Sequence, residues 1–234
     1  RFSEQEWQRF FKEKIANTNE GIVEKTRKIQ EDYVQNLTRD DGSTMNIALI
    51  DKHHIHNNRL QVINQYEVGT ENGARHDNRY DVTILVNGLP LVHVELKRRG
   101  VALKEAFNQI DRYQRDSFWA GCGLYEYVQI FVISNGTSTK YYSNTTRDSH
   151  LKENRNAGKK RSKKTSNSFE FTSFWADGSN RIIPDLVDFT KTFFARHTLL
   201  NILTKYCVFT SEKLLLVMRP YQIVATERIM NRIE

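Results

Sequence analysis

The sequence predicts an α/β protein in which a mixed β-sheet is flanked by helices. Two β-branched, apolar runs, 82–86 and 91–96, flank Asn87-Gly88, a dipeptide typical of hairpin turns. A helical pattern of apolar residues follows over 102–117, and a strongly β-prone run covers 128–134. Strands and helices in this order are typical of a mixed sheet covered by helices.

The predicted hairpin carries charged side chains at its outer ends. Asp81 begins the first run, while Glu95 and Lys97 end the second and share one face because they are two positions apart. Asp81 lies on that face only if the loop has an odd number of residues, or if a bulge restores the parity. We therefore predict a loop over 87–89, or a longer odd stretch through Pro90.

Two carboxylates and a lysine in this arrangement predict metal-dependent phosphodiester hydrolysis. Carboxylates brought together repel each other unless a cation neutralises them, and oxygen ligands that leave water positions open suit Mg²⁺. The ion activates a water and stabilises charge on the phosphate, and Lys97 adds a point charge beside them. On spacing alone, an ordinary hairpin with solvated charges at its ends explains the pattern equally well.

The other elements are expected on either side of the hairpin. Ser3 and Glu6 have the spacing of a capping box at the start of the first helix. The other helices carry apolar stripes and are predicted over 2–15, 22–37, 183–206 and from about Ile223 onward. The other strands are predicted over 45–50, 60–66 and, after Asn135-Gly136, 138–143.

Length and composition are typical of a soluble globular chain. Its 234 residues fit one large domain, or one domain with a piece of another, at about 150 residues each. No apolar run approaches the ~20 residues of a membrane span, and no signal-peptide pattern opens the chain. Cys122 and Cys207 match no metal spacing and are typical of reduced thiols in a cytoplasmic protein. The chain begins without Met, directly in a helix, so we expect it to be part of something longer.

The net charge of +7 is concentrated in one segment. Between Arg147 and Lys164, eight basic residues stand against two acidic ones in a stretch rich in Ser, Asn and Thr. This composition predicts a loop. A solvated insertion and a sequence-independent phosphate contact explain it about equally well.

Two smaller patterns point less clearly to a function. His53, His54 and His56 are not predicted to bind a metal, because no nearby residues complete a site. Gln109 and Tyr113 are one turn apart on the predicted helix over 102–117 and can act together. Alone, such a pair is more often a hydrogen-bonded helix edge than a functional site.

Together these motifs resemble the endonuclease region of the motor (R) subunit of type I restriction enzymes, within the PD-(D/E)xK nuclease superfamily. The resemblance rests on Asp81, on Glu95-Leu96-Lys97 and on Gln109-x-x-x-Tyr113, which looks like the QxxxY motif of the RecB-like branch. Further similar segments span 21–28, 79–90, 105–110, 131–137 and 197–201. The resemblance covers nearly the whole chain and implies a restriction-endonuclease-like fold.

The resemblance also implies roles for the site residues. Asp81 and Glu95 would bind Mg²⁺, and Lys97 would assist the attacking water or the phosphate. Gln109 and Tyr113 would position DNA or the active-site elements. The residue before Asp81 is Tyr80 rather than the Pro of the motif, which shapes the backbone and supplies no chemical group. An acidic residue on an earlier helix is often part of such sites. The candidates in this chain are Glu24, Glu31 and Glu67.

The C-terminal residues resemble the entrance to a helicase motor. After an apolar run over 214–218, Arg219-Pro220-Tyr221-Gln222 looks like the glutamine motif of superfamily 2 helicases, with Gln222 recognising adenine. Without the family, a Pro-started helix with an incidental Gln explains it equally well. No G-x-x-x-x-G-K-[ST] loop occurs, so we expect this chain neither to bind ATP well nor to hydrolyse it. The predicted domains are an endonuclease over 1–205 and, over 206–234, a linker with the first elements of a RecA-like motor.

The expected function is Mg²⁺-dependent cleavage of double-stranded DNA, coupled in the full subunit to ATP-driven translocation. The expected partners are DNA and the methyltransferase and specificity subunits of the same complex. We expect weak nuclease activity or none from this chain alone. Two alternatives stay open: a DNA-binding module with inert nuclease residues, and a coupling domain that regulates the motor through Gln109 and Tyr113.

Overall fold

The computed structural model describes residues 2–145 and 167–233, so the basic segment over 147–164 lies outside the described residues. The chain divides into two compact units, Arg1–Leu91 with Arg112–Val128 and Val92–Asp111 with Gln129–Glu234. Within the described ranges, no helix combines the length and the apolar character needed to cross a membrane.

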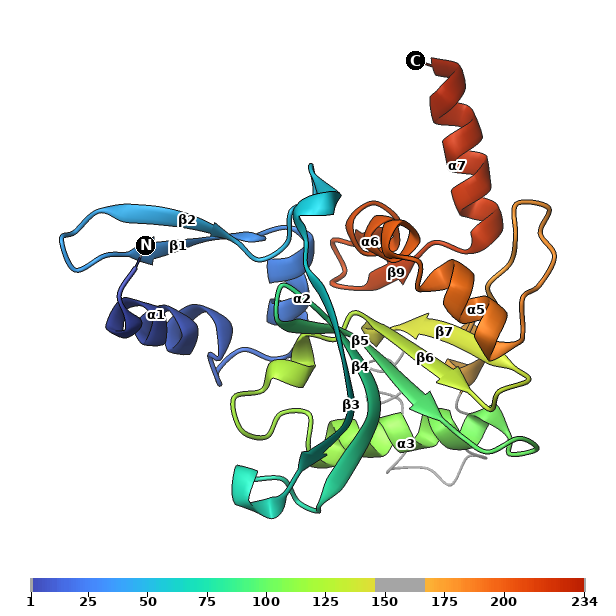
Figure 1. Cartoon of the computed structure of the whole chain (residues 1–234), viewed down its shortest axis with the longest axis horizontal. Coiled ribbons are helices and arrows are strands. Elements are labelled where there is room, and N and C mark those ends of the chain that lie inside the picture. Colours follow the sequence, from blue (N-terminus) through green and yellow to red (C-terminus); the bar gives the residue numbers. More distant parts are fainter. Residues whose placement is uncertain (1, 146–166, 234) are drawn as a thin grey trace. The chain divides into compact units, whose positions relative to one another are not determined.

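A five-stranded sheet with the order β3-β4-β5-β6-β7 forms the core of the fold (Figure 1). Its strands are β3 (Leu60–Val68), β4 (Asn78–Val86), β5 (Leu89–Leu96), β6 (Ile130–Ser134) and β7 (Thr139–Ser143). The β5–β6 pair is parallel, whereas β3–β4 and β6–β7 are antiparallel. A parallel pair needs a crossover, which α3 (Leu103–Asp116) supplies. The predicted mixed sheet with flanking helices is confirmed.

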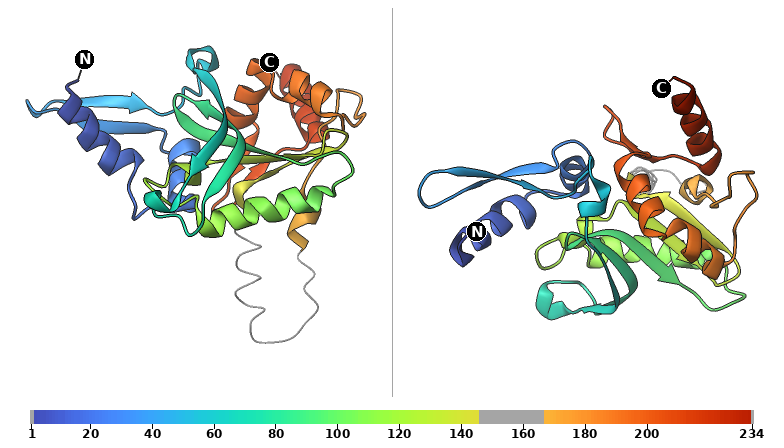
Figure 2. Two further views of the ribbon diagram at one scale, coloured as in Figure 1. Left: turned by 60° about the horizontal axis from the view of Figure 1, so that its bottom comes forward. Right: turned by 45° about the horizontal axis from the view of Figure 1, so that its top comes forward.

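Helix α3 lies where the sequence pattern placed it, one residue shorter at each end than the predicted 102–117. Its buried side includes Phe107, whose ring centroid is 4.9 Å from that of Tyr142 on β7. Figure 2 shows α3 as the long green helix from two further sides. The apolar stripe of this helix therefore packs against the sheet, as its period predicts.

The turn of the central hairpin is tighter than predicted. β4 ends at Val86 and β5 begins at Leu89, with only Asn87 and Gly88 between them, at φ +52° and +86°. Positive φ at both positions is the type I′ geometry, whose twist matches that of antiparallel strands. The predicted odd-length loop is therefore wrong. The parity argument then requires a bulge, and β4 is indeed irregular at Asp81, as described below.

The first unit begins with the predicted N-terminal helix. It consists of α1 (Glu4–Phe10) and a π-helical turn (Phe11–Ile15). The capping box is confirmed, because Glu6 accepts from the Ser3 amide at 2.7 Å and Ser3 Oγ accepts from the Glu6 amide at 3.1 Å.

The second predicted helix, over 22–37, is wrong in its last part. α2 (Ile22–Gln30) ends before Val34–Thr38, which forms strand β1 and pairs antiparallel with β2 (Thr44–Ala48). In β1 only Gln35 and Leu37 are buried, the alternation expected of a strand. This pairing depends on residues that follow in the sequence, so the helical spacing of Leu37 was misleading.

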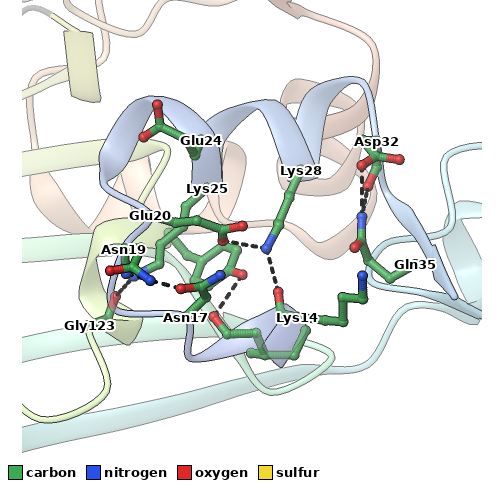
Figure 3. A network of polar contacts seen from close by, with 12 residues as sticks. Lys14, Asn17, Asn19, Glu20, Glu24, Lys25, Lys28, Asp32, Gln35 and Gly123 are labelled. Atoms are coloured by element: carbon green, nitrogen blue, oxygen red, sulfur yellow. Dashed lines mark hydrogen bonds and ion pairs between the residues drawn. The ribbon is translucent and has the colours of Figure 1, made fainter. Parts of the chain in front are cut away.

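Two lysines of α2 point into the protein (Figure 3). Lys25 is fully buried, and its Nζ donates to the Gly123 carbonyl at 2.9 Å and to Glu126 at 3.0 Å. Lys28 donates to the Lys14 carbonyl and to Glu20. These bonds give both ammonium groups acceptors, and those of Lys25 hold α2 to a segment 98 to 101 residues away in the sequence.

The single predicted helix over 183–206 is wrong, because two helices occupy it in the second unit. α5 (Leu186–Phe193) and α6 (Arg196–Thr204) are separated at Phe194 and Ala195, whose ψ angles of 3° and 130° leave the helical region. The apolar pattern continues through this break, so spacing alone did not indicate it.

The chain ends with β8 (Cys207–Phe209), β9 (Leu215–Val217) and α7 (Pro220–Ile233). α7 begins three residues before the predicted Ile223, with Pro220 at its first position, where a missing amide costs nothing. The boundary at residue 205 and the RecA-like character of this end stay predictions.

Candidate active site

A buried carboxylate with an ionic partner is the centre of the candidate site in the second unit. Glu95 is fully buried near the end of β5, and its Oε1 accepts a hydrogen bond from Lys97 Nζ at 2.9 Å. Lys97 Nζ also donates to Oε1 of Gln109 on α3. The Lys97 amide donates to the Ser134 carbonyl at 2.8 Å, which extends the parallel pairing with β6 past the end of β5. The predicted shared face of Glu95 and Lys97 is therefore present, and Gln109 joins them there.

The second oxygen of Glu95 has the properties of a metal ligand. It is buried, and no hydrogen-bond donor reaches Oε2 among the residues that the structure describes. A buried carboxylate oxygen without a donor is costly, and a hard cation such as Mg²⁺ prefers this kind of ligand.

The ligand set fits Mg²⁺ better than a structural metal ion. Within residues 2–145 and 167–233, no three His, Cys, Asp or Glu side chains lie close enough together to hold a metal ion. His53, His54 and His56 do not form such a group either. Closed zinc sites need four protein ligands, whereas Mg²⁺ commonly takes one or two carboxylates and keeps several waters.

His93 is a neighbour of Glu95 that the sequence argument overlooked. Both side chains are fully buried, and His93 Nε2 lies 3.7 Å from Glu95 Oε2. The imidazole meets Phe131 edge-on, with centroids 6.3 Å apart. At 3.7 Å the nitrogen is beyond hydrogen-bond distance, so His93 borders Oε2 without occupying its lone pairs. The spacing of two between His93, Glu95 and Lys97 could have identified it.

Asp81 lies in the first unit, half-buried on β4. Tyr113, which is almost fully buried, donates its hydroxyl to the Arg79 carbonyl at 2.9 Å, two residues before Asp81. Gln109 and Tyr113 thus have different targets, although one helix turn separates them. Gln109 binds a site side chain, whereas Tyr113 binds the backbone that leads to Asp81.

Two of the three candidates for a third acidic ligand, Glu24 and Glu31, have local partners instead. Glu24 accepts from the Gly21 amide at 3.1 Å and caps α2, where Figure 3 shows it pointing away from the two lysines. Glu31 lies 3.8 Å from Arg27 on the same helix. Glu67 stands opposite Arg79 in the β3–β4 register. None of these contacts favours a metal-binding role, so a third ligand stays unassigned.

Gln222 has a local structural contact. Its Oε1 accepts a hydrogen bond from the Arg219 amide at 2.8 Å, at the start of α7. A cavity of about 410 Å³ in the same unit is lined in part by Arg219, Tyr221 and Gln222. The predicted adenine contact stays a prediction.

Comparisons with known proteins extend over the whole chain. The profile of the family described as "Type I restriction enzyme R protein N terminus" matches residues 1–150. The chain is 52% identical over 233 residues to the Type I restriction enzyme EcoprrI endonuclease subunit of Escherichia coli, covering 100% of this chain and 68% of that protein.

Two staphylococcal relatives are longer. The chain is 35% identical over 216 residues to the Type I restriction enzyme SsaAORF53P endonuclease subunit of Staphylococcus saprophyticus, covering 91% of this chain. It is 38% identical over 197 residues to the SauCOLORF180P endonuclease subunit of Staphylococcus aureus strain COL, covering 84% of this chain. The matches span only 20% and 18% of those two proteins.

Proposed function

Because the chain belongs to the family of type I restriction enzyme R protein N-terminal regions, we propose that it is the nuclease part of such a subunit and that it cleaves double-stranded DNA in a reaction that requires Mg²⁺. The observation that supports this most directly is Glu95. It is a fully buried carboxylate with one oxygen bound to Lys97 and the other without a donor among the described residues. A merely solvated charge at the end of a hairpin would not be buried in this way.

Each site residue has a task in this proposal. Asp81 and Glu95 hold the ion, which when bound supplies an activated water and neutralises charge on the scissile phosphate. Lys97 places an ammonium group beside Glu95, where it can hold the water or a phosphate oxygen. Gln109 restrains that ammonium group by accepting from it. The two contacts select one direction for a side chain that is otherwise flexible.

The activity of the whole subunit extends the proposal beyond this chain. ATP-driven translocation, adenine recognition by Gln222, and assembly with methyltransferase and specificity subunits belong to this part of the proposal. Its support is the similarity to endonuclease subunits of which this chain covers between 18% and 68%.

The experiment compares wild type with Asp81→Asn in the full subunit, assembled with its partners. DNA cleavage in Mg²⁺ and ATP hydrolysis are measured in the same samples. We expect cleavage to disappear while ATP turnover persists, because the substitution removes a ligand charge without changing side-chain size. Asp188→Asn, an exposed carboxylate on α5, is the control and should leave both activities unchanged.

Other outcomes identify the alternatives. Loss of both activities would make Asp81 a structural or coupling residue. Retained cleavage would mean that the chemistry lies elsewhere and would refute the proposal. If DNA is bound but not cut even by wild type in the full assembly, the chain is a binding module whose nuclease residues are inert.

A further inference from the structure

The pairing of β3 with β4 is irregular at the position of Asp81. In the register with β3, Tyr80 pairs with Tyr66 and Val82 pairs with Asn64. Gln65 stands between these partners, opposite Asp81, and has φ +51°. A residue other than Gly is strained in this left-handed region, and the conformation persists only where the surroundings enforce it. The backbone opposite Asp81 is therefore held in a strained conformation.

Side-chain directions show the same irregularity on β4 itself. Tyr80 and Thr83 are three positions apart and would point to opposite faces of a regular strand. Both contact Tyr125, however: its ring centroid is 4.5 Å from that of Tyr80, and its hydroxyl is 3.1 Å from Thr83 Oγ1. The alternation breaks between these two residues, in the segment that contains Asp81.

Hydrogen bonds hold this segment on its N-terminal side. The Tyr80 hydroxyl donates to Ser117 Oγ at 2.6 Å, and Ser117 Oγ donates to the Tyr113 carbonyl at 3.2 Å. Tyr80 and Ser117 are both almost fully buried, so water does not compete for this hydrogen bond. The residue directly before Asp81 is thus fixed by its side chain as well as by its backbone.

We propose that Tyr80 and Ser117 are positioning residues for Asp81, and that their hydrogen bond sets the direction in which the Asp81 carboxylate is presented to the metal ion. This rests on the proposed function of Asp81. Neither hydroxyl touches the reacting atoms. Together with the Thr83–Tyr125 contact, the Tyr80–Ser117 bond keeps β4 in the irregular conformation on both sides of Asp81.

The test uses Tyr80→Phe, which removes one hydroxyl and keeps the aromatic packing, and Ser117→Ala, which removes its partner. Tyr66→Phe is the matched control. Its ring stacks on Tyr125 at 5.7 Å in the same cluster, and no hydrogen bond of its hydroxyl occurs among the described residues. Binding of Mn²⁺, as a probe for Mg²⁺, is titrated calorimetrically on the 234-residue chain. The Mg²⁺ dependence of DNA cleavage is measured in the assembled enzyme, and the melting temperature of each variant is recorded.

We expect Tyr80→Phe and Ser117→Ala each to weaken Mn²⁺ binding about 10–100-fold, as loss of an orienting partner usually does. The Mg²⁺ concentration for half-maximal cleavage should rise similarly, and excess Mg²⁺ should restore the rate. The double variant should be no worse than either single variant, because both remove the same bond. Tyr66→Phe should bind Mn²⁺ as wild type does.

A purely structural role would lower the melting temperature of Tyr80→Phe and leave its metal dependence equal to that of Tyr66→Phe. That result would overturn the inference. Asp81→Asn in the same series distinguishes failure of the positioning role from failure of the proposed nuclease function. If it abolishes cleavage while Tyr80→Phe equals the control, only the positioning role fails. If it leaves cleavage intact, the proposed function fails as well.

Discussion

Lys97 Nζ lies 2.9 Å from Glu95 Oε1, and the two side chains come from the same end of β5, two positions apart. Glu95 is fully buried, whereas the Lys97 side chain is 19% exposed. A buried carboxylate is stable only with a cation or donors beside it. Lys97 therefore stabilises the protein and also belongs to the proposed chemistry, so its substitution is expected to affect both.

Lys97→Met should abolish DNA cleavage and destabilise the chain by about 1–3 kcal/mol, because Glu95 would lose its cation while staying buried. This loss of stability is smaller than that for a fully buried ion pair, because Lys97 is partly exposed. Urea denaturation of the chain measures the free energy of unfolding. Lys104→Met, an exposed lysine on α3, is the control and should change it little. Unchanged stability of Lys97→Met would contradict the described ion pair.

Gln109→Leu and Tyr113→Phe should have different effects, because the two residues bind different targets. Tyr113→Phe leaves the Arg79 carbonyl without its donor and should cost about 1 kcal/mol of stability. Gln109→Leu releases Lys97 and should lower the cleavage rate with little loss of stability, since Gln109 is only half-buried. Cleavage, ATP turnover and denaturation are measured for both variants. If either variant changes ATP turnover directly and loses cleavage only as a consequence, the coupling alternative is favoured.

The strongest local patterns predicted the centre of the fold well. The hairpin, α3 and β6 combine a clear period with flanking turn residues, so their existence followed from the sequence. The contact between Glu95 and Lys97 followed from the pleat of a strand. These features depend on neighbours within a few residues, which sequence patterns describe best.

Features set by distant partners were not predictable in this way. Helix α2 ends at Gln30 because the following residues pair with β2, and the break at Ala195 leaves no trace in an apolar pattern that runs through it. In the sequence, Tyr80 stood out only as the residue in place of the motif's Pro. Its hydrogen-bond partner Ser117 is 37 positions away, so local patterns could not identify the contact. The irregular backbone at Gln65 is likewise set by packing rather than by its own sequence.

Gly123→Ala and Gly121→Ala should separate backbone strain from a steric conflict with the buried Lys25. Both glycines have nearly the same positive φ, +61° and +62°. An added Cβ meets nothing within 4 Å at Gly121, but it would lie 2.7 Å from Lys25 Nζ at Gly123. Gly121→Ala should cost about 1–2 kcal/mol from the left-handed backbone alone. Gly123→Ala should cost about 1–3 kcal/mol more, because Lys25 must leave its buried partners.

Thermal or urea denaturation of the two glycine variants gives this difference directly. Combining each with Lys25→Met sharpens the measurement. The extra cost of Gly123→Ala should shrink in that background, whereas the cost of Gly121→Ala should not change. Equal costs for both variants in the wild-type background would show that Lys25 accommodates the added methyl group without losing its bonds.

The stability contributed by Glu6 should depend on pH. Hydrogen bonds from the amides of Asp40 and Ser3 lower the pKa of this carboxyl below its usual 4.5. A carboxyl whose pKa is lowered by folding contributes stability above its unfolded pKa, and this contribution is lost as the pH falls through the folded pKa. Glu6→Gln should therefore destabilise the chain most at neutral pH. The difference from wild type should shrink progressively below about pH 4.5.

Denaturation at a series of pH values between 7 and 3 measures this difference. Glu4→Gln is the control, because Glu4 lies in the same helical turn and accepts a solvent-exposed hydrogen bond from the Gln8 side chain. It should show a much smaller effect at pH 7. A difference between Glu6→Gln and wild type that stays constant down to the lowest pH would mean that the amide side chain, rather than the missing charge, causes the loss. The capping box of α1 would then owe its stability to shape and not to the ionised carboxylate.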